Sequence, residues 1–276
     1  MIKNIRIILL LLVAISTVSC SQYQKVLNKG TVEDRYKMAT ELYEAKKYTK
    51  AIPLFEKITP SYRDKPQMER IQYMVADAHF QTKDYSLAAY YFDKFAKNYP
   101  KSSKKEEAAY YSALSYYKLS PKYSLDQKET NQAIDALQNF IVSYPSSEYV
   151  VDANKLVKEL TVKLEKKSFE IAKQYYLIED YKAAITAFDN LMSDYLGTVY
   201  REEAMFLRFK ASNDLALKSV ITKKEERLNN AVKAHQKLKR NYPNSKFLEE
   251  ADKLLDVINK EIELLPKIET LVENGL

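Results

Sequence analysis

The chain has 276 residues, of which only three are glycine and one is cysteine, whereas 23 are tyrosine. So few glycines argue against hairpin-rich β folds and against the glycine-rich loops that bind phosphate groups. The formal net charge is +7, and the lysines are interspersed with glutamates, which is typical of a solvated helical surface and disfavours a nucleic-acid-binding protein.

The start of the chain is predicted to be a secretory signal peptide that covers residues 1–19. Two cationic residues precede an apolar run that is too short to span a bilayer comfortably. Cys20 follows where cleavage is expected, and residues 17–20 resemble a bacterial lipobox with Thr17 in place of the usual leucine. We therefore predict that Cys20 carries the lipid anchor, with fatty acyl chains such as palmitate. The alternative is an ordinary signal peptide followed by an incidental cysteine.

Residues 20–30 are mostly polar and are expected to form a lipidated tether. No aspartate follows Cys20, and no acidic run follows it either. In bacterial lipoproteins an aspartate directly after the lipidated cysteine is associated with retention at the inner membrane. An acidic run after that cysteine is associated with export to the cell surface. The expected location is therefore the periplasmic face of the outer membrane.

The stretch from Arg70 to Ser103 contains a repeated unit in its clearest form. Two runs of apolar residues at helical spacing are separated by Lys83-Asp84-Tyr85, and Tyr99-Pro100 ends the second run. Two short helices of this kind cannot bury their apolar faces alone, so they need neighbouring units of the same kind.

The same unit recurs along the chain. An alanine opens the second helix of each unit, and the alanines concerned are Ala51, Ala88, Ala133, Ala184 and Ala231. In the first helices, Ala39, Ala76 and Ala113 are spaced by 37 residues. This pattern resembles the tetratricopeptide repeat, whose period is roughly 34 residues. It predicts an all-α, tetratricopeptide-like helical solenoid of about five helix pairs plus a C-terminal helix.

The repeats are expected to form two halves, residues 31–145 and 146–276. Between the third pair's two helices, residues 120–127 are longer than a repeat turn requires and are read as an insertion, a feature that often serves binding. A run without proline or glycine from Val150 to Tyr175 predicts one long helix that bridges the two halves. Pro266 is expected to interrupt the terminal helix.

The order of these features resembles the BamD family, the lipoproteins of the β-barrel assembly machinery of the outer membrane. The resemblance rests on the lipobox at Cys20, on Tyr110-Tyr111-Ser112-Ala113-Leu114, on the end of the insertion at residues 126–133, and on residues 144–153, which begin Tyr144-Pro145-Ser146-Ser147. It implies a non-enzymatic protein whose C-terminal half binds the POTRA domains of BamA. Other lipoproteins of the machinery are further candidate partners. The resemblance also implies that the N-terminal repeats receive the C-terminal signal of unfolded outer membrane proteins.

An enzyme is disfavoured, and no cofactor or metal is expected. The two histidines, His79 and His235, fall in positions of the repeat that face the core. A single cysteine and the absence of a glycine-rich loop leave metal and phosphate sites without ligands. The remaining alternative is a structural scaffold lipoprotein with tetratricopeptide repeats, linked to cell-wall or division proteins.

Two sets of candidate binding residues follow. Aromatic residues at 37-residue spacing are predicted to line a peptide-binding groove on the first helices, with Arg70 near one end to pair with a peptide carboxylate. The groove residues are Tyr36, Tyr43, Arg70, Tyr73, Asp77, Phe80, Tyr110 and Tyr117. Some of these rings could equally be interhelical core. Position in the C-terminal half, as the resemblance implies, gives the candidate partner-binding residues Arg201, Glu202, Arg208, Leu254 and Leu255, although the two leucines could equally cap the last core layer.

Overall fold

A computed structural model describes residues 22–273, with side chains up to Pro266. The expected signal peptide, residues 1–19, and Cys20 lie outside the described residues. Residues 22–29 were expected to belong to a tether, but they are helical. Tyr23 donates a hydrogen bond from its hydroxyl to the carbonyl oxygen of Lys50 (3.1 Å), and Val26 packs against the core of the first helix pair. These contacts join the segment to the repeats.

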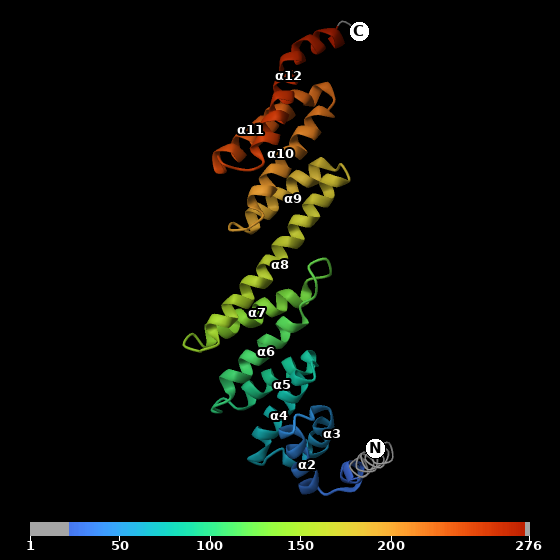
Figure 1. Ribbon diagram of the computed structural model, residues 1–276, viewed down its shortest axis with the longest axis vertical. Helices are drawn as coiled ribbons and strands as arrows, with labels where there is room; N and C mark the ends of the chain where they lie inside the picture. The colour runs from blue at the N-terminus through green and yellow to red at the C-terminus, as the bar shows by residue number, and fades with distance from the viewer. Residues whose placement is uncertain (1–21, 274–276) are drawn as a thin grey trace, which may run out of the picture. The chain divides into compact units, whose positions relative to one another are not determined.

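The described residues are helical and contain no strand, so the prediction of an all-α fold is confirmed (Figure 1). Five pairs follow one another, and one more helix follows the last pair. The pairs are α2 (Val32–Glu44) with α3 (Tyr48–Ile58), α4 (Gln67–Gln81) with α5 (Tyr85–Asn98), α6 (Lys105–Leu119) with α7 (Lys128–Ser143), α8 (Val150–Leu177) with α9 (Tyr181–Asp194), and α10 (Arg201–Leu217) with α11 (Ile221–Asn241). A short 3₁₀ turn, η1 (Thr59–Tyr62), follows α3, and α12 (Leu248–Glu273) ends the described chain.

The turn inside a pair has a recurrent local chemistry. Lys46, Lys83 and Glu179 adopt left-handed backbone angles, with φ of 58°, 64° and 63°. Each ends the first helix of its pair, because its amide and the next one bond back to carbonyls of the last helical turn. Asp84 and Asp180 then cap the second helix, accepting bonds from backbone amides three residues on (3.4 and 3.1 Å). A short polar sequence therefore stops one helix and starts the next.

The alanines predicted to open the second helices are all fully buried. The large side chains four residues later are buried as well, namely Phe55, Phe92, Leu137, Phe188 and His235. A small residue lets two helices approach closely while a large one fills the adjacent layer of the core. The repeat pattern in the sequence is therefore the pattern of the core.

The described chain forms two compact units. One contains the residues up to 121 together with 127–157, and the other contains 122–126 together with the residues from 158 on. The predicted long helix is present as α8, which begins in the first unit and ends in the second. Residues 122–126 of the predicted insertion belong to the C-terminal unit, where Lys167 donates its ammonium to the carbonyl oxygen of Leu125 (2.5 Å).

The terminal helix differs from the prediction at Pro266. Instead of stopping there, α12 continues to Glu273. Ala251, Ile258 and Leu265 are all buried at seven-residue spacing, so one face of the helix is held against α10 and α11 up to the proline. Proline removes one backbone hydrogen bond without preventing the helix from continuing when packing holds it. None of the described helices is both long and apolar enough to cross a bilayer.

Candidate functional site

The N-terminal unit contains a pocket between α2, α4 and the end of α5, with a volume of about 500 Å³. Three of the predicted groove residues line it, namely Tyr43, Arg70 and Tyr73. Its other lining residues are Glu44, Pro66, Glu69, Met74, Phe95 and Lys104. The volume lies within the usual range of ligand pockets in proteins.

The two tyrosine hydroxyls of this region are occupied. The hydroxyl of Tyr43 donates a hydrogen bond to Asp77 on α4, and the hydroxyl of Tyr73 donates to Oε1 of Glu107 on α6 (2.6 Å). Burial, together with these bonds to carboxylates, raises the pKa of both phenols. Both hydroxyls therefore keep their protons at neutral pH and link the first helix of one pair to that of the next. What these residues offer a ligand is their aromatic rings.

Lys104 is a member of the pocket that the sequence reasoning missed. Its ammonium lies 2.5 Å from Oε2 of Glu107 and 5.4 Å from the ring centroid of Tyr73. Burial acts to raise the pKa of Glu107, but the bonds from Lys104 and Tyr73 outweigh it and hold that pKa below its usual value. The available signal was the position of Lys104 at the start of the third pair, three residues before Glu107, within one helical turn.

Tyr73 and Tyr110 occupy equivalent positions, 37 residues apart, and they make equivalent bonds. Tyr73 donates to Glu107, and Tyr110 donates to Asp152. Both acceptors stand in the first turn of the next pair's first helix. A tyrosine bound to an acid is thus a repeated link between successive pairs.

Arg70 occupies the repeat position at which the next pair carries Glu107, the acid that accepts the tyrosine hydrogen bond. It precedes Glu107 by 37 residues, and Tyr36 precedes Tyr73 by the same distance. Tyr36 therefore has a guanidinium where the later tyrosines have a carboxylate, and its ring packs instead on that of Tyr62 (centroids 5.4 Å apart). The substitution places a cation at the mouth of the pocket, where its only ion pair in the described chain is with Glu44 (3.4 Å).

The remaining predicted groove residues do not line the pocket. Tyr110 is only 5% exposed and stacks on Tyr149. Phe80 is half-buried with its ring centroid 5.1 Å from that of Tyr111, and Tyr117 is half-buried near the end of α6. The two aromatic rows of the sequence therefore divide into pocket residues and interhelical packing.

The predicted partner-binding arginines are both engaged within the chain. Arg201 donates from Nη1 to the carbonyl oxygen of Met192 (3.0 Å) in the last turn of α9 and to that of Leu196 (3.2 Å) just beyond the helix. Arg208 forms a two-pronged ion pair with Asp189, its Nε and Nη2 lying 3.1 and 3.2 Å from the two carboxylate oxygens. Arg201 thus has a structural task, whereas Arg208 also lines a pocket.

The other predicted partner-binding residues lie on α10 and α12. Glu202 is half-buried in the first turn of α10, and Leu255 is half-buried on α12. Leu254 packs against the core of the C-terminal unit. Removing α12 would therefore expose core residues, so point substitutions test this surface better than truncation does.

Both histidines are buried, as their positions in the repeat predicted. His235 shares a hydrogen bond of 2.6 Å between its Nε2 and Oδ1 of Asp252, and His79 stacks on Tyr91. Among the described residues no group of three or more histidine, cysteine, aspartate or glutamate side chains is placed to hold a metal ion.

Comparison with known proteins gives one family and several relatives. Residues 28–228 match the family model YfiO, described as an outer membrane lipoprotein. Several relatives carry the name outer membrane protein assembly factor BamD. The protein of Caulobacter vibrioides is 25% identical over 249 residues (89% of this chain and 78% of the relative). That of Rickettsia prowazekii is 26% identical over 214 residues (78% and 81%), and that of Neisseria meningitidis 22% over 236 residues (82% and 85%). Since the family model spans well over half of its residues, the chain belongs to the YfiO family of outer membrane lipoproteins.

Proposed function

We propose that this chain is a non-enzymatic subunit of the machinery that assembles β-barrel proteins in the outer membrane. It would be anchored through Cys20 at the periplasmic face, and it would bind both a BamA-like barrel protein and the C-terminal signal of unfolded outer membrane proteins. Three relatives are named assembly factors, and their similarity extends over most of the chain. The family's description as an outer membrane lipoprotein supports the anchor.

The observation that carries the client-binding part is the cation that replaces an acid at the mouth of the pocket. An unfolded barrel strand ends in an aromatic residue and a free carboxylate, with apolar side chains alternating before them. Arg70 and Lys104 supply donors for the carboxylate, and the half-buried rings of Tyr43 and Tyr73 supply apolar surface for the side chains. The pocket thus combines the two features that a C-terminal peptide needs.

The ion pair between Arg70 and Glu44 does not prevent Arg70 from binding a peptide carboxylate. The side chains of Arg70 and Glu44 are 57% and 64% exposed, and their nearest atoms are 3.4 Å apart. An ion pair so open to solvent adds little stability, so an incoming carboxylate can replace Glu44 at small cost.

Replacing Arg70 by glutamine is expected to weaken binding of a C-terminal barrel peptide roughly tenfold, the loss of one charge-assisted hydrogen bond. The measurement is fluorescence anisotropy with a labelled peptide and with the same peptide amidated at its C-terminus. Amidation should weaken binding to the wild-type chain and have a smaller effect on Arg70→Gln, because the variant has already lost one of the two donors to the carboxylate. Arg63→Gln, at an exposed position outside the pocket, is the matched control. Equal effects of amidation on wild-type chain and variant would assign the carboxylate elsewhere.

Purification of the chain from detergent-solubilised outer membranes tests the function as a whole. A BamA-like barrel protein is expected to accompany it. Recovery of cell-wall or division proteins without any barrel protein would favour the structural scaffold instead. The partner surface proposed for this experiment is the C-terminal unit, with Glu202, Arg208 and Leu255 as the residues available from the predicted set.

A further inference from the structure

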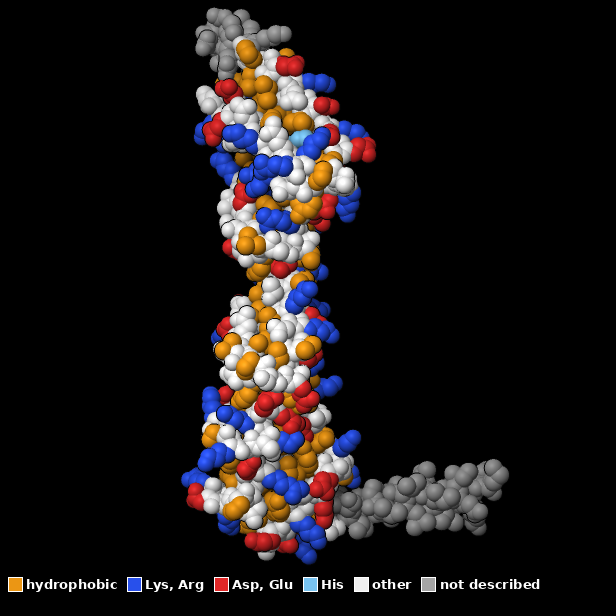
Figure 2. Space-filling model, turned by 90° about the vertical axis from the view of Figure 1, so that its left-hand side faces the viewer, with side chains coloured by type: hydrophobic (Ala, Val, Ile, Leu, Met, Phe, Trp, Pro, Cys, Tyr) orange, Lys and Arg blue, Asp and Glu red, His pale blue; other side chains and the backbone are white. Residues whose placement is uncertain are grey.

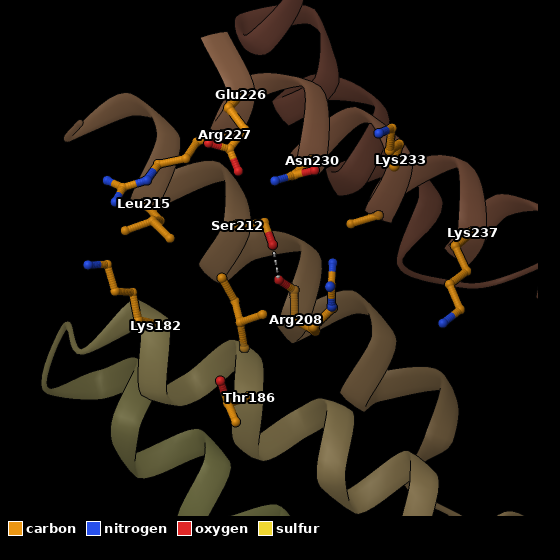
Figure 3. A pocket seen from close by; sticks show the side chains of 12 residues that line it. Lys182, Thr186, Arg208, Ser212, Leu215, Glu226, Arg227, Asn230, Lys233 and Lys237 are labelled. Atoms are coloured by element: carbon orange, nitrogen blue, oxygen red, sulfur yellow. Dashed lines mark hydrogen bonds between the residues drawn. The ribbon is translucent and has the colours of Figure 1, made fainter. Parts of the chain in front are cut away.

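The C-terminal unit contains a second pocket, of about 520 Å³, between α9, α10 and α11. Figure 3 shows five cationic side chains around it, Lys182 from α9, Arg208 from α10 and three from α11, namely Arg227, Lys233 and Lys237. Lys182 and Arg227 lie at one end of the pocket in this view, and Lys233 and Lys237 lie toward the other. Only one of the lining residues is acidic. Figure 2 shows lysine and arginine side chains close together on one face of this unit.

Most of these cations lack an acidic partner. In the described part of the chain, no carboxylate forms an ion pair with Lys182, Arg227, Lys233 or Lys237, whereas many other lysines are paired. Arg227 donates only to the hydroxyl of a serine, at 2.6 Å. Lys233 and Lys237 are four residues apart on one helix face, a like-charge arrangement that destabilises a helix. An anion bound between them would relieve that repulsion.

The equivalent grooves of other repeats show that this excess of charge is not a general property of the fold. The groove between α5, α6 and α7 has two lysines, of which Lys97 is paired with Asp93 (2.7 Å) and Lys105 lies over an aromatic ring. The groove between α3, α4 and α5 has one acid and one base, Glu56 and Lys94. Neither of these two grooves contains a cluster of cations without acidic partners like the one in the fifth pair.

The shape and the lining of the pocket indicate which kind of anion fits. Its residues on α11 run from Glu226 to Lys237, which corresponds to about 16 Å along the helix axis, much longer than a single phosphate or lipid headgroup. Ile185, Leu215 and Ala234 supply apolar surface between the charges. We propose that this pocket binds an acidic segment of a partner protein, in which carboxylates alternate with apolar side chains. The proposal specifies the chemistry of the partner-binding surface in the proposed function, because Arg208 belongs to this pocket and to that surface. It rests on the proposed function only in treating the C-terminal unit as a binding face.

The test uses the mature full-length chain and a fluorescein-labelled peptide in which glutamate and leucine alternate, with a second peptide carrying glutamine in place of each glutamate. The double variant Lys233→Gln/Lys237→Gln is expected to bind the acidic peptide roughly tenfold more weakly than the wild-type chain, because two charged contacts are lost. The double variant Lys223→Gln/Arg240→Gln removes the same charge from exposed positions of α11 outside the pocket, and its affinity should match the wild type. Added salt should weaken the wild-type interaction.

Three outcomes would overturn the proposal. One is equal affinity for the glutamine peptide, and another is the same loss in both double variants, which would indicate attraction by net charge alone. The third is a pocket-dependent interaction with phosphatidylglycerol vesicles but not with the acidic peptide, which would assign the pocket to the membrane surface. Both variants lie on the surface, and their thermal melts by circular dichroism verify the fold. Recovery of a barrel protein with the wild-type chain is measured in parallel, so failure of this pocket is distinguishable from failure of the proposed function.

Discussion

Replacing Tyr110 by alanine is expected to destabilise the N-terminal unit by about 3–5 kcal/mol, the usual cost of removing a large buried aromatic side chain. Tyr110 is 5% exposed, and its ring centroid lies 4.4 Å from that of Tyr149 in a stacked geometry and 5.5 Å from that of Phe140. Its hydroxyl donates to Asp152, which ties α6 to α8. Alanine would leave a cavity and remove both kinds of contact.

Urea unfolding followed by circular dichroism measures this effect. Tyr110→Phe keeps the ring and loses only the hydrogen bond, so a loss of about 1 kcal/mol is expected. Tyr90→Ala is the exposed control, because that side chain is 54% exposed, and its effect should stay within about 0.5 kcal/mol. If the Tyr110→Ala protein were as stable as the wild type but bound the peptide more weakly, Tyr110 would be a residue that contacts the peptide and not a core residue.

The fold was predictable because the repeat is visible in the sequence as a recurring pattern of small and large residues. Ala88 and Phe92 show why, since a buried small residue followed by a buried large residue four positions later recurs in the second helix of each pair. Lys83 and Asp84 show how the turns were predictable, because a helix stop and a helix cap need only a few adjacent residues. Local patterns of this kind depend on neighbours in sequence, which a single sequence displays directly.

The candidate site was only partly predictable, because its geometry depends on residues in other repeats. The sequence placed Tyr73 and Tyr110 in one row, yet one lines a pocket and the other is core. The difference lies in what faces each ring from the next pair, where Tyr149 covers Tyr110. Likewise, nothing local showed that Arg201 bonds to carbonyl oxygens at the end of α9. A pattern of spacing gives the helix face but not the partner that covers it.

The stability of the protein is expected to fall steeply as the pH rises above about 10, where tyrosines of the unfolded chain lose their protons. Burial, reinforced by a hydrogen bond to a carboxylate, raises the pKa of Tyr43, Tyr73 and Tyr110 in the N-terminal unit and of Tyr176 in the C-terminal unit. Above pH 10 the unfolded state therefore binds fewer protons than the folded state. The stabilisation from these groups is complete below that pH and is lost as pH rises through the raised pKa values.

The slope of this decline identifies the groups that cause it. Each tyrosine that stays protonated in the folded state lowers the free energy of unfolding by at most about 1.4 kcal/mol per pH unit, and by less where its ring is open to solvent. Urea unfolding of the wild type from about pH 8 to about pH 11 should show a plateau and then the decline. Tyr43→Phe/Tyr73→Phe should be less stable on the plateau, because Asp77 and Glu107 each lose a donor, but its decline above pH 10 should be shallower. Lysines titrate in the same range and do so in both proteins, so they cancel in the comparison. If the free energy of unfolding declined equally in the two proteins, these two hydroxyls would not resist ionisation. Burial and the hydrogen bonds to Asp77 and Glu107 would then not raise the pKa of either tyrosine enough to affect stability.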